Sequence, residues 1–196
     1  MKRPLSRPLD LRLLCLLLLV LGQAAGAKDT ALSGESAMPH FPIVKAANLE
    51  GRSFTLPHDL EGELNLLFVA FERRQQEDVD TWLPHARQLC QTDSRLRSYE
   101  LPTIRRGNPV MRWIINHGMA SGIHDPQARA STITLYLDKQ DFRAALGIER
   151  EEEITILLIK RDGSIRWRSQ GTWSAEKEGS LRQVLREENT GRPITP

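Results

Sequence analysis

The feature that most constrains this chain is a short apolar run followed by a polar turn and a helical pattern, all within residues 63–90. The run at 66–71 is rich in strand-forming residues and is too short to span a membrane, which is typical of a central strand covered on both faces. After the polar stretch 72–76, apolar residues recur at three- and four-residue steps and so share one helix face. They are Val79, Trp82, Leu83, Ala86, Leu89 and Cys90. Pro84 lies inside this helix and should kink it, because proline removes a backbone hydrogen bond.

The rest of the chain alternates between strand and helix patterns. A hairpin is expected at 41–56, and a second strand at 98–102 should end at Pro102. A helix should begin at Pro109, with Val110, Trp113, Ile114 and His117 on one face. Further expected elements are a strand at 132–137, a helix at 139–146 capped by Asp138 and closed by Gly147, a strand at 154–159, an Asp-Gly turn at 161–164 with a return strand at 165–168, and a helix at 175–188. This order predicts an α/β three-layer sandwich with a central mixed sheet and an N-terminal hairpin.

The 63–90 segment resembles the core of the thioredoxin-like superfamily. In its periplasmic thiol-disulfide members, the strand ends in phenylalanine, the first cysteine of C-x-x-C follows five residues later, and a helix proline lies eight residues beyond that. Phe71, Gln76 and Pro84 stand at these positions, so residues 76–79 replace the C-x-x-C. The resemblance implies a redoxin-type fold that lacks the catalytic cysteines.

Two further positions bear on redox chemistry. The superfamily's cis-proline precedes a threonine, eight residues before the aspartate of the Asp-Gly turn; here Ile154 precedes Thr155. Cys90 lies late in its helix on the apolar face, away from the helix N-terminus that would lower a thiol pKa. We therefore expect Cys90 to be a buried structural cysteine. The alternative is a thiol-dependent oxidoreductase or peroxidase-like enzyme that uses Cys90.

A second resemblance concerns the C-terminal half of the chain. Residues 118–125, Arg129, the strand from Thr132 and residues 162–167 look like the thioredoxin-like assembly factors of mitochondrial ATP synthase, and residues 101–106 are similar in character. The resemblance implies a chaperone-like, non-redox role in building a membrane complex.

The first 27 residues have the pattern of a secretory signal peptide. Basic residues precede a leucine-rich run at 13–21, and small residues at 25–27 offer a cleavage site. An uncleaved anchor is the alternative. We expect a flexible lead-in at 28–39, a thioredoxin-like domain at 40–189, a disordered tail at 190–196 and a periplasmic or secreted location.

Removal of the leader changes the charge and the cysteine count. The 27 basic and 25 acidic residues of the whole chain become 23 and 24, a net charge of about −1. Charges of both signs are interspersed, which argues against a nucleic-acid partner. Cys15 leaves with the leader, so Cys90 is alone and no intramolecular disulfide can form.

Binding is expected at exposed loops that follow the strands. Arginines and a glutamine from two such loops could hold a carboxylate or an acidic partner: Arg73, Arg74, Gln76, Arg105 and Arg106. A secondary candidate for a small ligand is the turn that carries His117, His124, Asp125 and Arg129. The histidine spacing specifies neither the ligand number nor the geometry of a metal site, and no motif points to a cofactor.

The sequence thus predicts an exported, redox-inactive thioredoxin-like protein that acts by binding, as an assembly factor or chaperone-like protein, rather than as an enzyme. Its partner would be another envelope protein or a membrane complex, with membrane contact only through an uncleaved leader.

Overall fold

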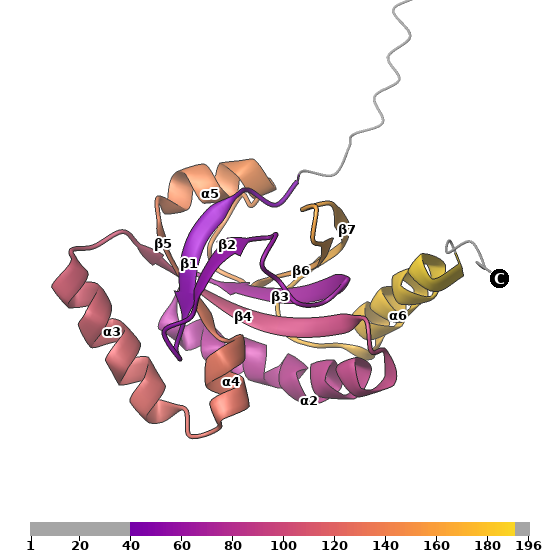
Figure 1. Cartoon of the computed structure of the whole chain (residues 1–196). Helices are drawn as coiled ribbons and strands as arrows, with labels where there is room; N and C mark the ends of the chain where they lie inside the picture. Colours follow the sequence, from indigo (N-terminus) through magenta and orange to yellow (C-terminus); the bar gives the residue numbers. More distant parts are fainter. Residues whose placement is uncertain (1–39, 191–196) are drawn as a thin grey trace, which may run out of the picture. The chain divides into compact units, whose positions relative to one another are not determined.

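Seven strands form one mixed sheet in the computed structural model, which describes residues 40–190 (Figure 1). The sheet order is β2-β1-β5-β4-β3-β6-β7. The strands are β1 (Val44–Asn48), β2 (Ser53–Leu56), β3 (Leu64–Ala70), β4 (Leu96–Arg105), β5 (Ile133–Leu137), β6 (Thr155–Lys160) and β7 (Ile165–Gln170). The three strands β3, β4 and β5 are parallel, whereas β6, β7 and the β1–β2 hairpin pair antiparallel. The predicted mixed sheet and N-terminal hairpin are confirmed.

Helices cover both faces of the sheet. They are η1 (Arg73–Gln75), α2 (Gln76–Thr92), α3 (Pro109–Gly122), α4 (Pro126–Ser131), α5 (Lys139–Leu146) and α6 (Ala175–Thr190). Helix α5 lies on one face, and α2 and α6 lie on the other (Figure 1). The ends of α5 agree with the prediction, because Asp138 accepts hydrogen bonds from the backbone N–H groups of Gln140 and Asp141, and Gly147 has a left-handed φ of 61°. The predicted three-layer α/β architecture is therefore confirmed.

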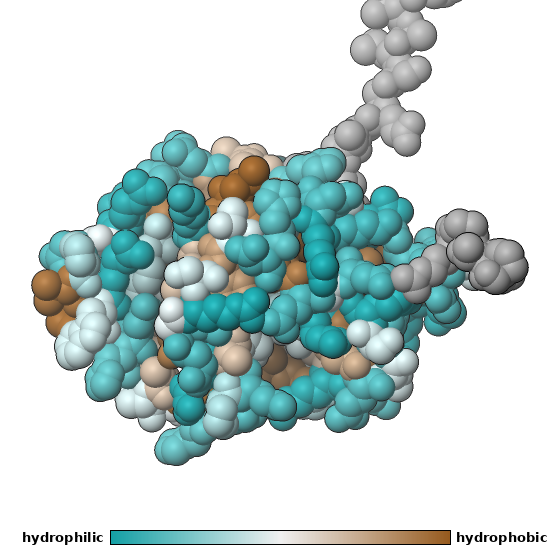
Figure 2. Space-filling view, in the orientation of Figure 1, coloured by the Kyte–Doolittle hydropathy of each residue, from teal (hydrophilic) through white to brown (hydrophobic). Residues whose placement is uncertain are grey.

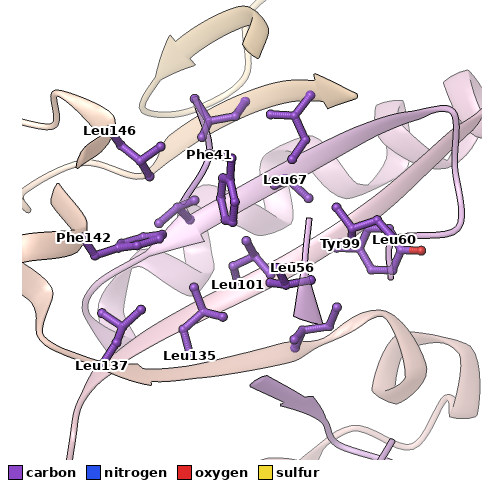
Figure 3. Packing of buried hydrophobic residues seen from close by; sticks show 14 of the residues in the cluster. Phe41, Leu56, Leu60, Leu67, Tyr99, Leu101, Leu135, Leu137, Phe142 and Leu146 are labelled. Carbon is purple, nitrogen blue, oxygen red and sulfur yellow. The ribbon is translucent and has the colours of Figure 1, made fainter. Parts of the chain in front are cut away.

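The central strand β3 has a hydrophobic core on each side. Leu66 and Phe68 pack with Trp82 of α2 and Leu181 of α6. The alternate residues Leu67 and Val69 face the α5 side, where the core includes Phe41, Leu101 and Phe142 (Figure 3). Side chains alternate across a strand, so a run of apolar residues in β3 requires cover on both faces.

The structure adds to or corrects the local expectations at three places. Pro102 does not end its strand, because β4 continues to Arg105 by pairing with β5 after its ladder with β3 stops at the Ala70–Pro102 pair. No helix was predicted between residues 123 and 131, where the structure has the short helix α4, which begins at Pro126 with Asp125 as its N-cap. The helix α3 forms where predicted, but none of its residues is fully buried.

Some predictions fall outside the described residues: the leader at 1–27, the lead-in at 28–39 and the last residues of the tail. Between residues 40 and 190, no helix is both long and apolar enough to cross a membrane.

Candidate functional site

The loop after β3 is held in place by a buried glutamine. The Gln75 side-chain oxygen accepts hydrogen bonds from the backbone N–H groups of Phe71 (2.7 Å) and Glu72 (3.1 Å), and its amide donates to the Glu151 carbonyl (2.5 Å). Gln75 is fully buried, although the sequence pattern placed it in an exposed tip. Its neighbours are all polar, so sequence periodicity carried no signal for this role. The consequence is a loop with a fixed backbone conformation.

A second contact fixes the same loop from α5. The Lys139 ammonium donates to the Phe71 carbonyl (2.8 Å) and pairs with the Glu151 carboxylate (3.1 Å), which Arg143 also approaches (3.2 Å). The acidic stretch 149–153 therefore lies beside the loop at 72–76. The loop's surroundings carry charges of both signs.

Gln76 stands at the start of α2, where the resemblance places the first redox cysteine. Its side-chain amide donates to Asp80 (3.0 Å) and to Glu100 of β4 (3.0 Å). Burial raises the pKa of Glu100, and the hydrogen bond from Gln76 offsets part of that rise. Val79, at the position of the second cysteine, is fully buried in the α2 core. This position therefore offers an amide and a half-buried carboxyl group in place of two thiols.

Cys90 lies where a reactive thiol is not expected. It is half-buried and packs against the core formed by α2 and α6. Burial raises the pKa of the Cys90 thiol, which lowers the fraction of the nucleophilic thiolate. Ile154, at the position of the superfamily's cis-proline, is fully buried. The chain's other cysteine is Cys15, so the sequence contains no C-x-x-C pair.

The four candidate arginines lie in two loops that leave the sheet at the same edge. Strands β3 and β4 are parallel neighbours, so the loops after Ala70 and after Arg105 both follow carboxyl ends. All four side chains are exposed. Arg74 pairs with Glu72 (2.5 Å) and has Asp78 and Glu152 nearby. Within residues 40–190, no ion pair occupies Arg73, Arg105 or Arg106.

The secondary candidate residues mainly support the backbone. Asp125 caps α4 by accepting from the backbone N–H of Gln127 (2.9 Å). Arg129 donates to the carbonyls of Ile123 (3.0 Å) and His124 (3.2 Å), and it pairs with Glu50 of the β1–β2 turn (2.6 Å). His117 is not part of this arrangement, because its ring stacks on Trp113 within α3, with ring centroids 5.3 Å apart.

No group of three or more His, Cys, Asp or Glu residues in the described part of the chain is arranged to hold a metal ion. An open hollow of about 450 Å³ lies between the α5–β6 connection and β7, lined by Gly147, Glu149, Arg150, Arg168, Ser169 and Gln170. The Arg168 guanidinium already donates to the carbonyls of Leu146 (2.7 Å) and Gly147 (3.1 Å). The hollow therefore offers a ligand little unengaged charge from Arg168.

Comparisons with known proteins identify the architecture. Neither a family model nor a curated protein matches the sequence. Among solved structures, the thioredoxin domain of a thiol-disulfide oxidoreductase from Bacteroides vulgatus is similar, with a TM-score of 0.51 and 14% identity over 76% of this chain and 97% of that one. The fold is thioredoxin-like.

Two other thioredoxin-like structures give the same result. A thioredoxin-like protein from Porphyromonas gingivalis matches with a TM-score of 0.51 and 11% identity, over 79% of this chain and 95% of that one. BsSco, a member of the Sco family of cytochrome c oxidase assembly proteins, matches with a TM-score of 0.50 and 11% identity. The match covers 76% of this chain and 92% of that one. At such identities the likeness shows the fold alone.

Proposed function

We propose that this thioredoxin-like chain is an exported protein that acts by binding another protein and not by thiol–disulfide exchange. The observation that carries the proposal is the replacement of the redox position by Gln76, which is hydrogen-bonded to Glu100, and by the buried Val79. Thiol–disulfide exchange requires an accessible thiolate. Cys90 is half-buried with a raised pKa. The residues present at this edge can form hydrogen bonds and ion pairs.

The edge is suited to binding because its backbone is already ordered. Gln75 and Lys139 hold the loop at 72–76 before any partner arrives, which reduces the entropy lost on association. Arg73, Arg105 and Arg106 are exposed and could each donate to a carboxylate. Acidic residues in the adjacent stretch 149–153 would repel a uniformly acidic surface. The partner is therefore a protein segment with a few placed carboxylates.

The wider role that fits this edge is assembly of an envelope complex. The resemblance of residues 101–106 and 118–125 to ATP synthase assembly factors supports a chaperone-like role. The solved structure of BsSco, from a family of cytochrome c oxidase assembly proteins, shows that the fold serves such proteins elsewhere. The leader at 1–27 supports export.

The test is crosslinking in the native envelope fraction. Wild-type protein and an Arg73→Glu/Arg74→Glu variant are compared by the yield of the crosslinked partner, identified by mass spectrometry. A Lys45→Glu/Arg186→Glu variant is the control, because it makes the same charge change at exposed positions on β1 and α6. We expect the edge variant to lose at least about tenfold in yield and the control to retain it, with melting temperatures within roughly 2 °C. Equal yields for both variants would exclude this edge.

A further inference from the structure

The helix α3 turns its apolar stripe away from the domain. At 100° per residue, Val110, Trp113, Ile114 and His117 share one side of the helix. The four large apolar side chains Val110, Met111, Trp113 and Ile114 are between 50% and 67% exposed. Trp113 is the most exposed of the chain's four tryptophans, since Trp82 and Trp167 are buried and Trp173 is half-buried.

The opposite side of α3 contacts the domain, and its half-buried residues are Ile115, Asn116, Met119 and Ala120. The Arg112 guanidinium lies over the Tyr136 ring, 4.7 Å from its centroid. The Tyr136 hydroxyl donates to the Asn116 side-chain oxygen (2.7 Å). Arg112 lies on the side of the helix away from Ile114, and Asn116 lies beside Trp113 at the edge of the stripe. The contacts of Arg112 and Asn116 with Tyr136 join α3 to β5, while Val110, Trp113 and Ile114 face solvent.

The charges within α3 and the segment before it have one sign. Residues 101–124 contain no aspartate or glutamate, whereas they contain Arg105, Arg106 and Arg112. The first two are exposed immediately before α3 begins. Figure 2 shows a hydrophobic patch at the outer end of α3, on the side of the domain away from α6. An exposed apolar ridge on a segment whose only charged residues are arginines is complementary to an anionic, apolar phase.

We propose that α3 is a membrane-contact helix, which lays its apolar stripe into the interface of a bilayer that contains anionic phospholipids. Trp113 would lie at the headgroup level, where tryptophan is favoured, and Arg105 and Arg106 would contact headgroup phosphates. This inference goes beyond the proposed protein binding and does not depend on it.

A second copy of the chain fits the stripe less well. Two α3 helices in contact would bring their arginines together, and residues 101–124 carry no carboxylate to neutralise them. A bilayer also accepts a convex ridge, whereas a protein partner needs a matching groove. The leader, with its apolar run at 13–21, would bring the chain to a membrane during export.

The test uses the exported protein with vesicles of equal parts phosphatidylglycerol and phosphatidylcholine, and with vesicles of phosphatidylcholine alone. Transfer of Trp113 from water into the interface shifts its fluorescence emission to shorter wavelength. We expect this shift with the anionic vesicles, its loss in Trp113→Phe, and at least a tenfold weaker binding for Val110→Ser/Ile114→Ser. Arg105→Gln/Arg106→Gln should remove the preference for anionic vesicles.

Controls separate this surface from others. Ile43→Ser alters an apolar side chain that is 71% exposed but lies outside α3, so it should bind vesicles like the wild type. Arg73→Glu/Arg74→Glu should also bind vesicles normally. This variant therefore tests the proposed partner edge separately from the proposed membrane contact of α3. An unchanged emission spectrum on anionic vesicles would overturn the proposal, and so would equal vesicle binding by Val110→Ser/Ile114→Ser. Concentration-dependent dimers that Ile114→Ser abolishes would assign the stripe to a second copy instead.

Discussion

The helices α2 and α3 begin alike and end in opposite environments. Each follows a strand of the parallel pair β3–β4, and each carries an apolar stripe with a tryptophan at its centre. In α2 the stripe lies on the sheet, and Trp82 is fully buried with its indole N–H donating to the Gly171 carbonyl (3.0 Å). In α3, Arg112 and Asn116 contact Tyr136, and Trp113 is exposed. Periodicity thus predicts a helix, but the available neighbours decide which side is covered.

The two helices should differ most in how much stability is lost when the tryptophan of each is replaced by alanine. Trp82→Ala should lower the free energy of unfolding by about 3–5 kcal/mol, because it leaves a cavity beneath Phe68 and Trp167 and an unpaired Gly171 carbonyl. Trp113→Ala should change it by less than about 0.5 kcal/mol. Urea unfolding followed by circular dichroism measures both values. Similar losses for the two variants would mean that α3 is covered in solution.

An intermediate effect is expected where α6 meets α2. Glu178 of α6 accepts hydrogen bonds from Trp173 (2.8 Å) and Arg182 (2.8 Å), and lies 2.8 Å from His85 of α2, whose ring stacks on Trp173. Glu178→Gln should cost roughly 1–2 kcal/mol, since it leaves part of this network unpaired. Glu187→Gln, at an exposed position of the same helix, is the control and should cost less than about 0.5 kcal/mol in the same urea titration.

The same network has a pH dependence of defined sign. Burial acts to raise the pKa of Glu178, but the hydrogen bonds from Trp173 and Arg182 outweigh it, so the pKa lies below its ordinary value of 4.5. A carboxyl group with a lowered pKa stabilises the fold above its unfolded value and loses that contribution as the pH falls through the folded value. The stability difference between wild type and Glu178→Gln should therefore shrink below about pH 4.5. A difference that is constant with pH would contradict an ionised Glu178.

The smallest expected effect within α2 is at Cys90. Cys90→Ala should cost on the order of 1 kcal/mol, because a half-buried sulfur is lost near the end of the helix. Partner crosslinking should be unchanged, and neither wild type nor variant should reduce insulin or peroxide. Insulin reduction coupled to a thiol reductant measures this directly. Thiol-dependent turnover that disappears in Cys90→Ala would restore the enzyme hypothesis.

Local patterns in the sequence were sufficient to predict several elements of the fold. The apolar run of β3 required cover on both faces, the Asp138 and Gly147 signals marked the ends of α5, and the Asp-Gly turn at 162–163 placed the β6–β7 hairpin. Each of these signals acts through backbone geometry or side-chain alternation over a few residues. The absence of C-x-x-C was likewise visible in the sequence alone.

Contacts between residues far apart in the sequence decided the features that local patterns did not predict. Pro102 remains within β4 because β5 takes over the pairing, and the buried Gln75 donates a hydrogen bond to the carbonyl of Glu151, 76 residues away. The Glu178 network joins α2 to α6, and no local pattern connects them. In α3, Arg112 and Asn116 contact Tyr136 of β5, Ile115 and Met119 are half-buried, and Val110, Trp113 and Ile114 remain exposed. Sequence periodicity therefore determined that α3 is amphipathic, whereas only tertiary packing decided that its apolar stripe faces outward, since burial depends on which surface is available to cover each side.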